Sequence, residues 1–316
     1  MSAALTERQE QEIEALCRIA KENGAALTLR ELIGLAAIDT SEQELEAAFN
    51  PDSRLGSKFV LESGYVFDRS SVARESSRQA AQYEESRREH ARANLTSARR
   101  FGTALRRGAI VVSVSGGNSF LSAGEGEDID LFCVTKTNDM WRFMLRALIL
   151  ARIHRLANRD VPSLCFSCVM DEEWARKAFG KRQNAIFARD ALTAKVIDGT
   201  KAYLALLEGA PWMGEYFPTL YRARLQEISS GDSRAIRERG AGKDGSVILN
   251  SFLHFALGSF LRIKSWALNR KFSVAGRVSS MFTTRMGPGH YIYESNRYRR
   301  LGTMYGDIWK HEQAGS

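Results

Sequence analysis

Proline, cysteine and uncharged apolar runs are all scarce in this chain of 316 residues, which has five prolines and four cysteines. Proline interrupts helix interiors, so its scarcity favours long helices. Four cysteines over this length do not form a disulfide framework and suggest reduced thiols in a cytoplasmic protein. Hydrophobic residues make up 44% and charged residues 26% of the chain. That balance excludes a disordered or low-complexity polymer and predicts a folded protein rich in helix.

Membrane insertion and zinc binding are both disfavoured. The most apolar helical run, Met140–Leu156, contains four arginines, and Met1–Gln11 is polar. Neither a membrane span nor a signal peptide is therefore predicted. Cys165 and Cys168 have zinc-type spacing, but the sequence offers no second pair and no histidine cluster to complete a site. We expect no membrane partner and no zinc.

Positive charge is what the chain has in excess. The formal net charge of +8 favours polyanionic partners such as nucleic acid or a nucleoside triphosphate, although a plain basic surface is the simpler alternative. Arginines dominate the second half of the helix-favouring segment 71–107. They predict either a solvated helix face or a basic rim suited to phosphate or RNA.

The first seventy residues have the pattern of a small separate domain. Capping boxes begin helices at Thr6, Thr28 and Ser41. Two alternating runs, Lys58–Leu61 and Tyr65–Phe67, then flank a Glu-Ser-Gly turn and predict a hairpin. Three helices and a hairpin resemble a winged helix. Because the third helix carries three glutamates that would repel phosphate, we expect this domain to contact a protein partner rather than to read DNA.

A loop of small residues between two predicted strands is the first candidate for chemistry. The apolar runs Ile110–Val114 and Leu131–Val134 are the strands. Glycines have no Cβ, so their N–H groups can approach a bulky anion, and small polar side chains can add donors. The candidate nucleotide-binding residues are Gly116, Gly117, Asn118 and Ser119.

Two aspartates, Asp128 and Asp130, open the second of these strands. Strand alternation predicts that both point to one face. Neighbouring carboxylates repel each other, and a cation between them removes that cost. Mg²⁺ typically takes one or two carboxylates plus the phosphates of a substrate. The stretch therefore predicts a nucleoside-triphosphate and Mg²⁺ site, with Mn²⁺ as the alternative ion and a plain hairpin with an acidic strand start as the bland alternative.

The sequence Gly116-Gly117, then ten residues, then Asp128-Ile129-Asp130-Leu131 resembles the nucleotidyltransferase signature of the DNA polymerase beta superfamily. More loosely, most of the chain, including Met170-Asp171-Glu172 and Arg189-Asp190 with Thr193, resembles stand-alone prokaryotic nucleotidyltransferases. The resemblance implies an α+β fold, with a mixed sheet flanked by helices, a winged-helix-like domain before it and a helical domain after it. It also implies that the Asp pair binds metal and that an NTP is the substrate.

The third carboxylate of the superfamily is missing from its usual position. The third predicted strand, Ser163–Met170, has Ser167 where a carboxylate is implied. Asp171 lies four residues on and shares its parity. Three alternatives stay open: an activity resting on two carboxylates, a displaced catalytic carboxylate at Asp171, or a degenerate binding domain.

The part of the chain after residue 175 is predicted to be mostly helical. We expect an amphipathic helix over Ile186–Leu207, a mobile loop over Ser229–Gly245 and an apolar helix over Val247–Leu268. Bases then alternate with aromatics, a combination suited to phosphate contact and base stacking. The candidate acceptor-binding residues are Arg285, Arg297 and Arg299.

These patterns divide the chain into four parts: a winged-helix-like domain (1–70), a charged linker helix (71–107), a catalytic core (108–175) and a helical nucleotide- and acceptor-binding region (176–316). The expected function is Mg²⁺-dependent transfer of NMP from an NTP to an acceptor hydroxyl. RNA, with tRNA included, is the favoured acceptor, and a protein or a small molecule is the alternative. A non-catalytic nucleotide-sensing or regulatory protein is the rival class.

Overall fold

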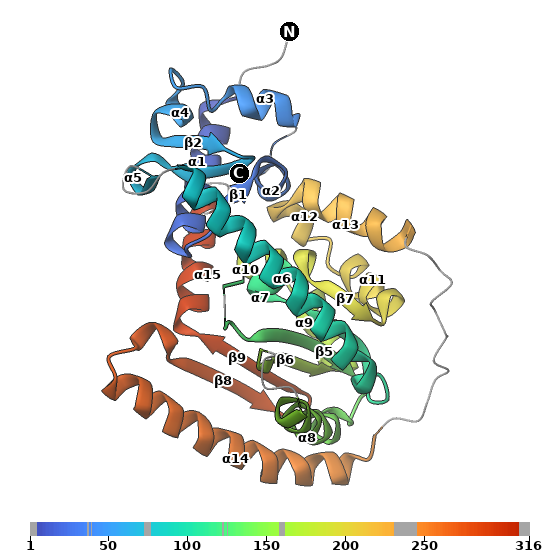
Figure 1. Cartoon of the computed structure of the whole chain (residues 1–316). Helices are drawn as coiled ribbons and strands as arrows, with labels where there is room; N and C mark the ends of the chain where they lie inside the picture. Colours follow the sequence, from blue (N-terminus) through green and yellow to red (C-terminus); the bar gives the residue numbers. More distant parts are fainter. Residues whose placement is uncertain are drawn as a thin grey trace.

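A mixed sheet with the strand order β7-β4-β5-β6-β9-β8 organises the chain (Figure 1). The computed structural model describes residues 5–36, 38, 40–72, 77–121, 123–124, 126–157, 162–230 and 245–309. Strands β5 and β6 are parallel, and the other neighbouring strands are antiparallel. The α+β class with a mixed sheet is thus confirmed. The strands are β4 (Ala109–Val114), β5 (Ile129–Thr135), β6 (Leu164–Asp171), β7 (Lys195–Asp198), β8 (Phe282–Gly287) and β9 (His290–Ser295).

Helices cover both faces of this sheet. On β5, Ile129, Leu131 and Cys133 point into a core shared with α6 (Ser77–Leu105), α8 (Met140–Ala157) and α14 (Val247–Val274). Phe132 and Val134 point into the opposite core. The helices of that second face are α9 (Glu172–Gly180), α10 (Ala185–Thr193), α11 (Thr200–Glu208), α12 (Met213–Tyr216), α13 (Pro218–Ser230) and α15 (Asn296–Trp309).

The three strands expected around the glycine loop are confirmed, but one helix prediction is wrong. The run Ile186–Leu207 is not one helix, because strand β7 separates α10 from α11. Gly199 makes the turn possible: its φ is +83°, and a Cβ there would lie 1.9 Å from the carbonyl oxygen of Ile110. The pairing of β7 with β4, far away in sequence, selects a strand where local periodicity favours helix.

The C-terminal part corrects a second expectation. The alternating bases and aromatics after residue 281 form the hairpin β8–β9, which pairs with β6 at one side of the sheet. Together with β7, this hairpin means that three of the strands in the sheet come from beyond residue 175. The prediction of a mostly helical region is therefore wrong for these segments. The predicted loop at Ser229–Gly245 lies largely outside the described residues.

The N-terminal elements follow the predicted order. All three capping boxes are present, and they begin α1 (Glu7–Glu22), α2 (Leu29–Leu35) and α3 (Glu42–Ala47). The hairpin turns at Ser63 and Gly64, which both have positive φ, as a two-residue hairpin loop requires. The remaining elements are β1 (Leu27–Thr28), α4 (Arg54–Lys58), β2 (Phe59–Glu62), β3 (Tyr65–Asp68) and α5 (Arg69–Val72).

An ion pair and further hydrogen bonds from arginine hold this N-terminal module against the rest of the chain. Arg88 on α6 donates to both carboxylate oxygens of Glu31 on α2, at 3.0 and 2.8 Å. Arg297 on α15 donates to the side chain and the backbone of Asn23, just after α1. Figure 1 shows α6 running from the module across the sheet and α15 returning to it. The module therefore stands over the ends of the strands where the glycine loop lies.

Candidate functional site

The glycine loop and the second predicted strand touch. The Ser115 N–H donates to the carbonyl of Asp130 at 3.0 Å, and the short helix α7 (Gly116–Ser119) follows. Gly116 has a φ of +65°, and a Cβ built on it would lie 2.8 Å from Oδ2 of Asp130. Only glycine satisfies both the left-handed backbone and this close approach. The loop thus brings bare backbone against a carboxylate.

Asn118 and Ser119 lie inside the loop, with 1% and 3% of their surfaces exposed. The Asn118 amide donates to the carbonyl of Asp128 at 3.0 Å and accepts from Asn94 of α6 at 2.8 Å. The Ser119 hydroxyl donates to the carbonyl of Gly116 at 2.8 Å. Both side chains are therefore engaged in shaping the loop, and the surface of the loop is left to the two glycines.

Asp128, Asp130 and both glycines line one cleft, here called the acid cleft, which lies between the N-terminal module, α6, α10, α15 and the sheet. Its volume is about 370 Å³, within the range of about 300–1,000 Å³ of small-molecule sites. Ile129 between the two aspartates is fully buried. The alternation predicted for this strand is present, and both carboxylates face the cleft.

Electrostatics make the aspartate pair a strong candidate for cation binding. The pKa of Asp130 is raised to about 7, mainly by burial and also by the nearby carboxylates of Asp128, Asp190 and Glu127, while a hydrogen bond from Cys165 opposes the shift. Desolvation also raises the pKa of Asp128, opposed by hydrogen bonding to Ser163. A bound cation would stabilise the charged form of both carboxylates and so offset the burial and the repulsion that raise their pKa values.

The donor set fits a hard divalent ion that also takes substrate oxygens. Carboxylate oxygens suit Mg²⁺ or Mn²⁺ rather than a soft metal. Among the residues described by the structure, no three His, Cys, Asp or Glu side chains are grouped closely enough to hold an ion by themselves. A pair of carboxylates completed by phosphates and water is the arrangement that Mg²⁺ commonly takes.

Asp171 is not brought to this pair. It pairs in register with Thr135 at the far end of β5, whereas Asp130 pairs with Cys165. Five residues along a strand correspond to about 16 Å. The Asp171 carboxylate accepts from the N–H of Trp174 at 2.9 Å and so caps α9. The structure therefore gives Asp171 a local role at the opposite end of the strand.

Asp190 and Arg189 are the residues that motif reasoning left without a role. Both line the acid cleft, and Arg189 donates through Nε and Nη2 to Asp190, at 2.9 and 2.6 Å. The Arg189 guanidinium also lies 4.9 Å from the ring centres of Phe120 and Tyr305. The signal available in the sequence was a charged pair inside an otherwise apolar helix, a pattern that implies burial with a partner.

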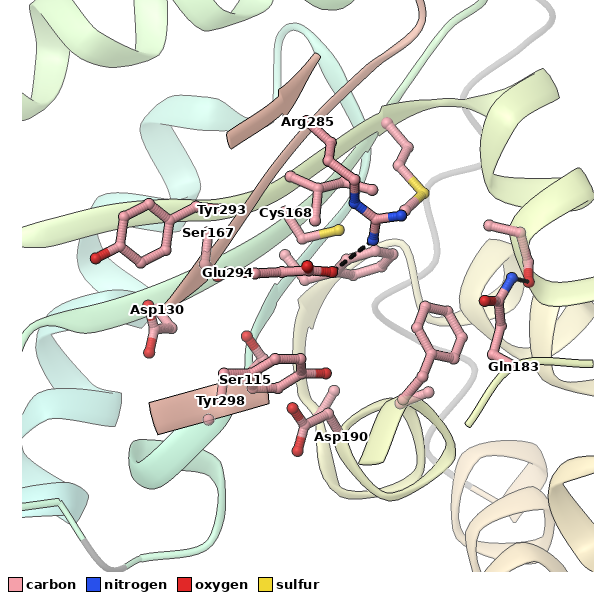
Figure 2. A pocket seen from close by; sticks show the side chains of 18 of the residues that line it. Ser115, Asp130, Ser167, Cys168, Gln183, Asp190, Arg285, Tyr293, Glu294 and Tyr298 are labelled. Atoms are coloured by element: carbon pink, nitrogen blue, oxygen red, sulfur yellow. Dashed lines mark hydrogen bonds and ion pairs between the residues drawn. The ribbon is translucent and has the colours of Figure 1, made fainter. Parts of the chain in front are cut away.

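A second cavity adjoins the cleft, here called the aromatic cavity, with a volume of about 220 Å³. Its walls include Phe132, Phe179, Phe187 and Tyr203. Figure 2 shows Asp130 and Gln183 at opposite ends of this cavity in the view drawn. The two cavities share six lining residues: Gly116, Asp130, Asp190, Tyr293, Ser295 and Tyr298. The carboxylate of Asp130 thus stands at the junction of a polar cleft and an apolar pocket.

The three arginines proposed for acceptor contact are dispersed. Arg285 of β8 lines the aromatic cavity and pairs with Glu294 (Figure 2). Arg297 lines the acid cleft, where its Nη1 lies 3.8 Å from Glu127. Arg299 is exposed, donates to Asn296 and lines neither of these two cavities. Arg285 and Arg297 therefore line different cavities, and neither is among the residues that the two cavities share.

No protein-family model, curated protein or solved structure matches this chain in the three comparisons made. Its function is therefore inferred from its own residues.

Proposed function

We propose that this protein is a Mg²⁺-dependent nucleotidyltransferase, which transfers NMP from an NTP to an acceptor hydroxyl. The observation that carries the proposal is the close approach of Gly116 to Asp130, where even one Cβ would meet the carboxylate at 2.8 Å. A surface for phosphate and a ligand for metal therefore adjoin each other in one cleft. The resemblance of the motif to the DNA polymerase beta superfamily supports the same conclusion.

Asp128 and Asp130 would hold the divalent ion. When bound, the ion supplies positive charge that offsets the charge on the phosphates and on the acceptor oxygen. N–H groups in the first turn of a helix have no partner within that helix, so Gly116 and Gly117 can donate to the triphosphate. The acceptor hydroxyl would attack the α-phosphorus in line and lose its proton to water, while the bond to the β-phosphate breaks and pyrophosphate leaves. Catalysis comes mainly from positioning and from charge neutralisation.

The aromatic cavity supports the proposal from the other side of Asp130. A nucleobase is flat, and aromatic side chains such as Phe187 and Tyr203 offer it apolar contact. Gln183 at the far end carries both a donor and an acceptor that could read a base edge. Asp190 lines both cavities and adds to the negative charge around Asp130, whereas Asp171 lies at the opposite end of the strand.

RNA, with tRNA included, is the acceptor favoured by the net charge of +8 and by Arg297 in the wall of the cleft. A protein or a small molecule is the alternative acceptor, and the N-terminal module is the candidate surface for a protein partner. Binding of RNA should weaken steeply as salt rises, because phosphate contacts release counterions. An acceptor affinity that does not change with salt would favour the small molecule.

The test is transfer of label from each α-labelled NTP to a total cell extract with Mg²⁺. Asp128→Asn and Asp130→Asn should both abolish transfer while the far-UV spectrum is unchanged. Asp52→Asn, an exposed aspartate of the N-terminal module, is the matched control and should label the same species as the natural chain. Undiminished transfer in both cleft variants would reject the assignment.

A non-catalytic nucleotide-sensing protein is the second candidate, favoured by Ser167 at the position of the third superfamily carboxylate. Thermal shift with each NTP, with and without Mg²⁺, separates the two, because a ligand that binds only the folded state raises the melting temperature. Metal-independent stabilisation by an NTP without any turnover would favour the sensor.

A further inference from the structure

Helix α14 packs against α8, and the outer side of α14 is an exposed apolar surface, here called the α14 face. In α14, Ile248, Phe252, Phe255, Ile263 and Trp266 are separated by four, three, eight and three residues, so they share one side of the helix. Phe255 is 75% exposed and Trp266 is 64% exposed. On α8, the exposed apolar residues are Leu145, Ile149, Ile153 and Leu156. Exposed patches of this kind mark interaction surfaces.

Hydrogen bonds near both ends of α14 fix its rotation, so the apolar stripe cannot turn toward the core. Near its start, the Asn250 side chain accepts from the N–H of Trp141 and donates to the carbonyl of Pro288, both at 2.9 Å. Near its end, Asn269 makes two hydrogen bonds with the backbone of Phe282, at 2.7 and 3.0 Å. Leu261, on the inner side, is buried in the core. Figure 1 shows α14 as the outermost element along the lower edge of the molecule.

The charges around the apolar stripe indicate a negatively charged partner. Neither α8 nor α14 contains aspartate or glutamate. Exposed basic residues lie among the apolar ones: Arg152, Arg262 and Arg270. The Arg270 guanidinium lies 5.7 Å from the ring centre of Trp266. A second copy of this chain would set the same cations against each other in a two-fold contact, whereas an anionic surface would neutralise them.

We propose that the α14 face binds the surface of an anionic lipid bilayer. Helices that lie in the interfacial plane place Trp, Phe and Leu in the acyl boundary and Lys or Arg at the headgroups. Among the described residues, no helix has the length and apolarity needed to cross a bilayer, so the contact is one of surface binding. The inference departs from the sequence prediction of no membrane partner, which considered only spanning segments, and it does not depend on the proposed enzymatic activity.

Flotation of the full chain with vesicles tests the apolar part of the contact. The natural chain should float with vesicles of phosphatidylcholine mixed with phosphatidylglycerol and not with vesicles of phosphatidylcholine alone. The double variant Phe255→Ser/Trp266→Ser should lose binding at least about tenfold. Tyr83→Ser on α6 removes an aromatic ring that is equally exposed, at 65%, and should bind like the natural chain. Because these side chains are exposed, the variants should melt like the natural chain.

The charges are tested separately. Arg262→Gln/Arg270→Gln should weaken partitioning about 30-fold, because each arginine near an anionic surface contributes about 1 kcal/mol. The loss should shrink in high salt. Arg99→Gln/Arg100→Gln, two exposed arginines of α6, should not change partitioning. Equal flotation of the double charge variant and the natural chain would overturn the proposal.

Tryptophan fluorescence reports the depth of the contact. Brominated phosphatidylcholine in the anionic vesicles should quench part of the emission of the natural chain, and Trp266→Phe should bind equally but lose that quenching. Binding to neutral and anionic vesicles alike would overturn the proposal. So would a dimer in solution that Phe255→Ser dissociates, since the face would then be covered by a second copy.

Discussion

Gly116→Ala is the most specific test of the proposed site, because the added Cβ affects both the backbone of the glycine loop and the carboxylate of Asp130. Gly116 has a φ of +65°, and its new Cβ would lie 2.8 Å from Oδ2 of Asp130. An L-residue in the left-handed region costs about 1–2 kcal/mol. Ordinary contact begins at 3.4 Å, so the carboxylate must move by the difference, 0.6 Å. The variant should therefore be slightly less stable and have a displaced metal ligand.

Gly126→Ala separates these two effects. Gly126 lies in the same loop with a φ of +75°, and a Cβ there would meet nothing within 4 Å. Both variants should lose similar stability, about 1–2 kcal/mol. In chains somewhat smaller than this one, that lowers the melting temperature by about 2–4 °C per kcal/mol. Both variants carry the cost of an L-residue at positive φ, but only the Cβ of Gly116→Ala would contact Asp130.

The assay is the initial rate of label transfer from the α-labelled NTP identified in the extract experiment, measured beside thermal melting. Because a misplacement of about 1 Å can cost about 100-fold in rate, a shift of 0.6 Å should cost about tenfold in Gly116→Ala. Gly126→Ala should stay near the natural rate. Equal rates in the two variants would refute the idea that Gly116 and Asp130 act together, whatever the melting curves show.

Further predictions follow from the same geometry. The unfolded Asp130 carboxyl loses its proton near pH 3.9 and the folded one near pH 7, so the folded state holds more protons between these values and stability should fall as pH rises through that window. Thermal melting against pH should show this fall in the natural chain and a weaker one in Asp130→Asn; identical profiles would contradict the assignment. Mg²⁺ should raise the melting temperature of the natural chain at pH 8, but not that of Asp130→Asn, because the ion binds the ionised carboxylate. Asp171→Asn should keep both the cap of α9 and transfer, whereas Asp171→Ala should cost about 1 kcal/mol of stability; loss of transfer in Asp171→Asn at unchanged stability would instead make Asp171 catalytic. Phe187→Ser in the aromatic cavity should raise the KM for NTP more than it lowers kcat, and an unchanged KM would argue against a base in that cavity.

Local signals in the sequence were sufficient for the N-terminal module and for the strands around the glycine loop. The capping boxes of Thr6, Thr28 and Ser41 act over three residues, so each can be read without knowing the fold. The turn at Ser63 and Gly64 is equally local. Asp128 and Asp130 share a face because alternation is a property of any strand.

Contacts between segments that are distant in sequence could not be predicted from these local signals. Strand β7 pairs with β4, and the hairpin β8–β9 pairs with β6, more than a hundred residues earlier. Neither pairing leaves a local pattern, and the alternating bases and aromatics of β8–β9 predicted phosphate contact and base stacking rather than a hairpin. Asp171 and Asp130 lie at opposite ends of the paired strands because of the register of β5 against β6. Strand alternation predicts which face a side chain points to, but it does not predict this register.

The chain by itself determined that a glycine turn precedes a pair of same-facing aspartates, because both features depend on neighbours a few residues away. Only the tertiary structure decided what surrounds them: Asp190 from α10, the module over the cleft, and the aromatic cavity behind Asp130. It also decided that the apolar stripe of α14 faces outward, since Asn250 and Asn269 bind backbone groups of distant segments. Burial and pairing between remote segments set these features, and such contacts have no period in the sequence.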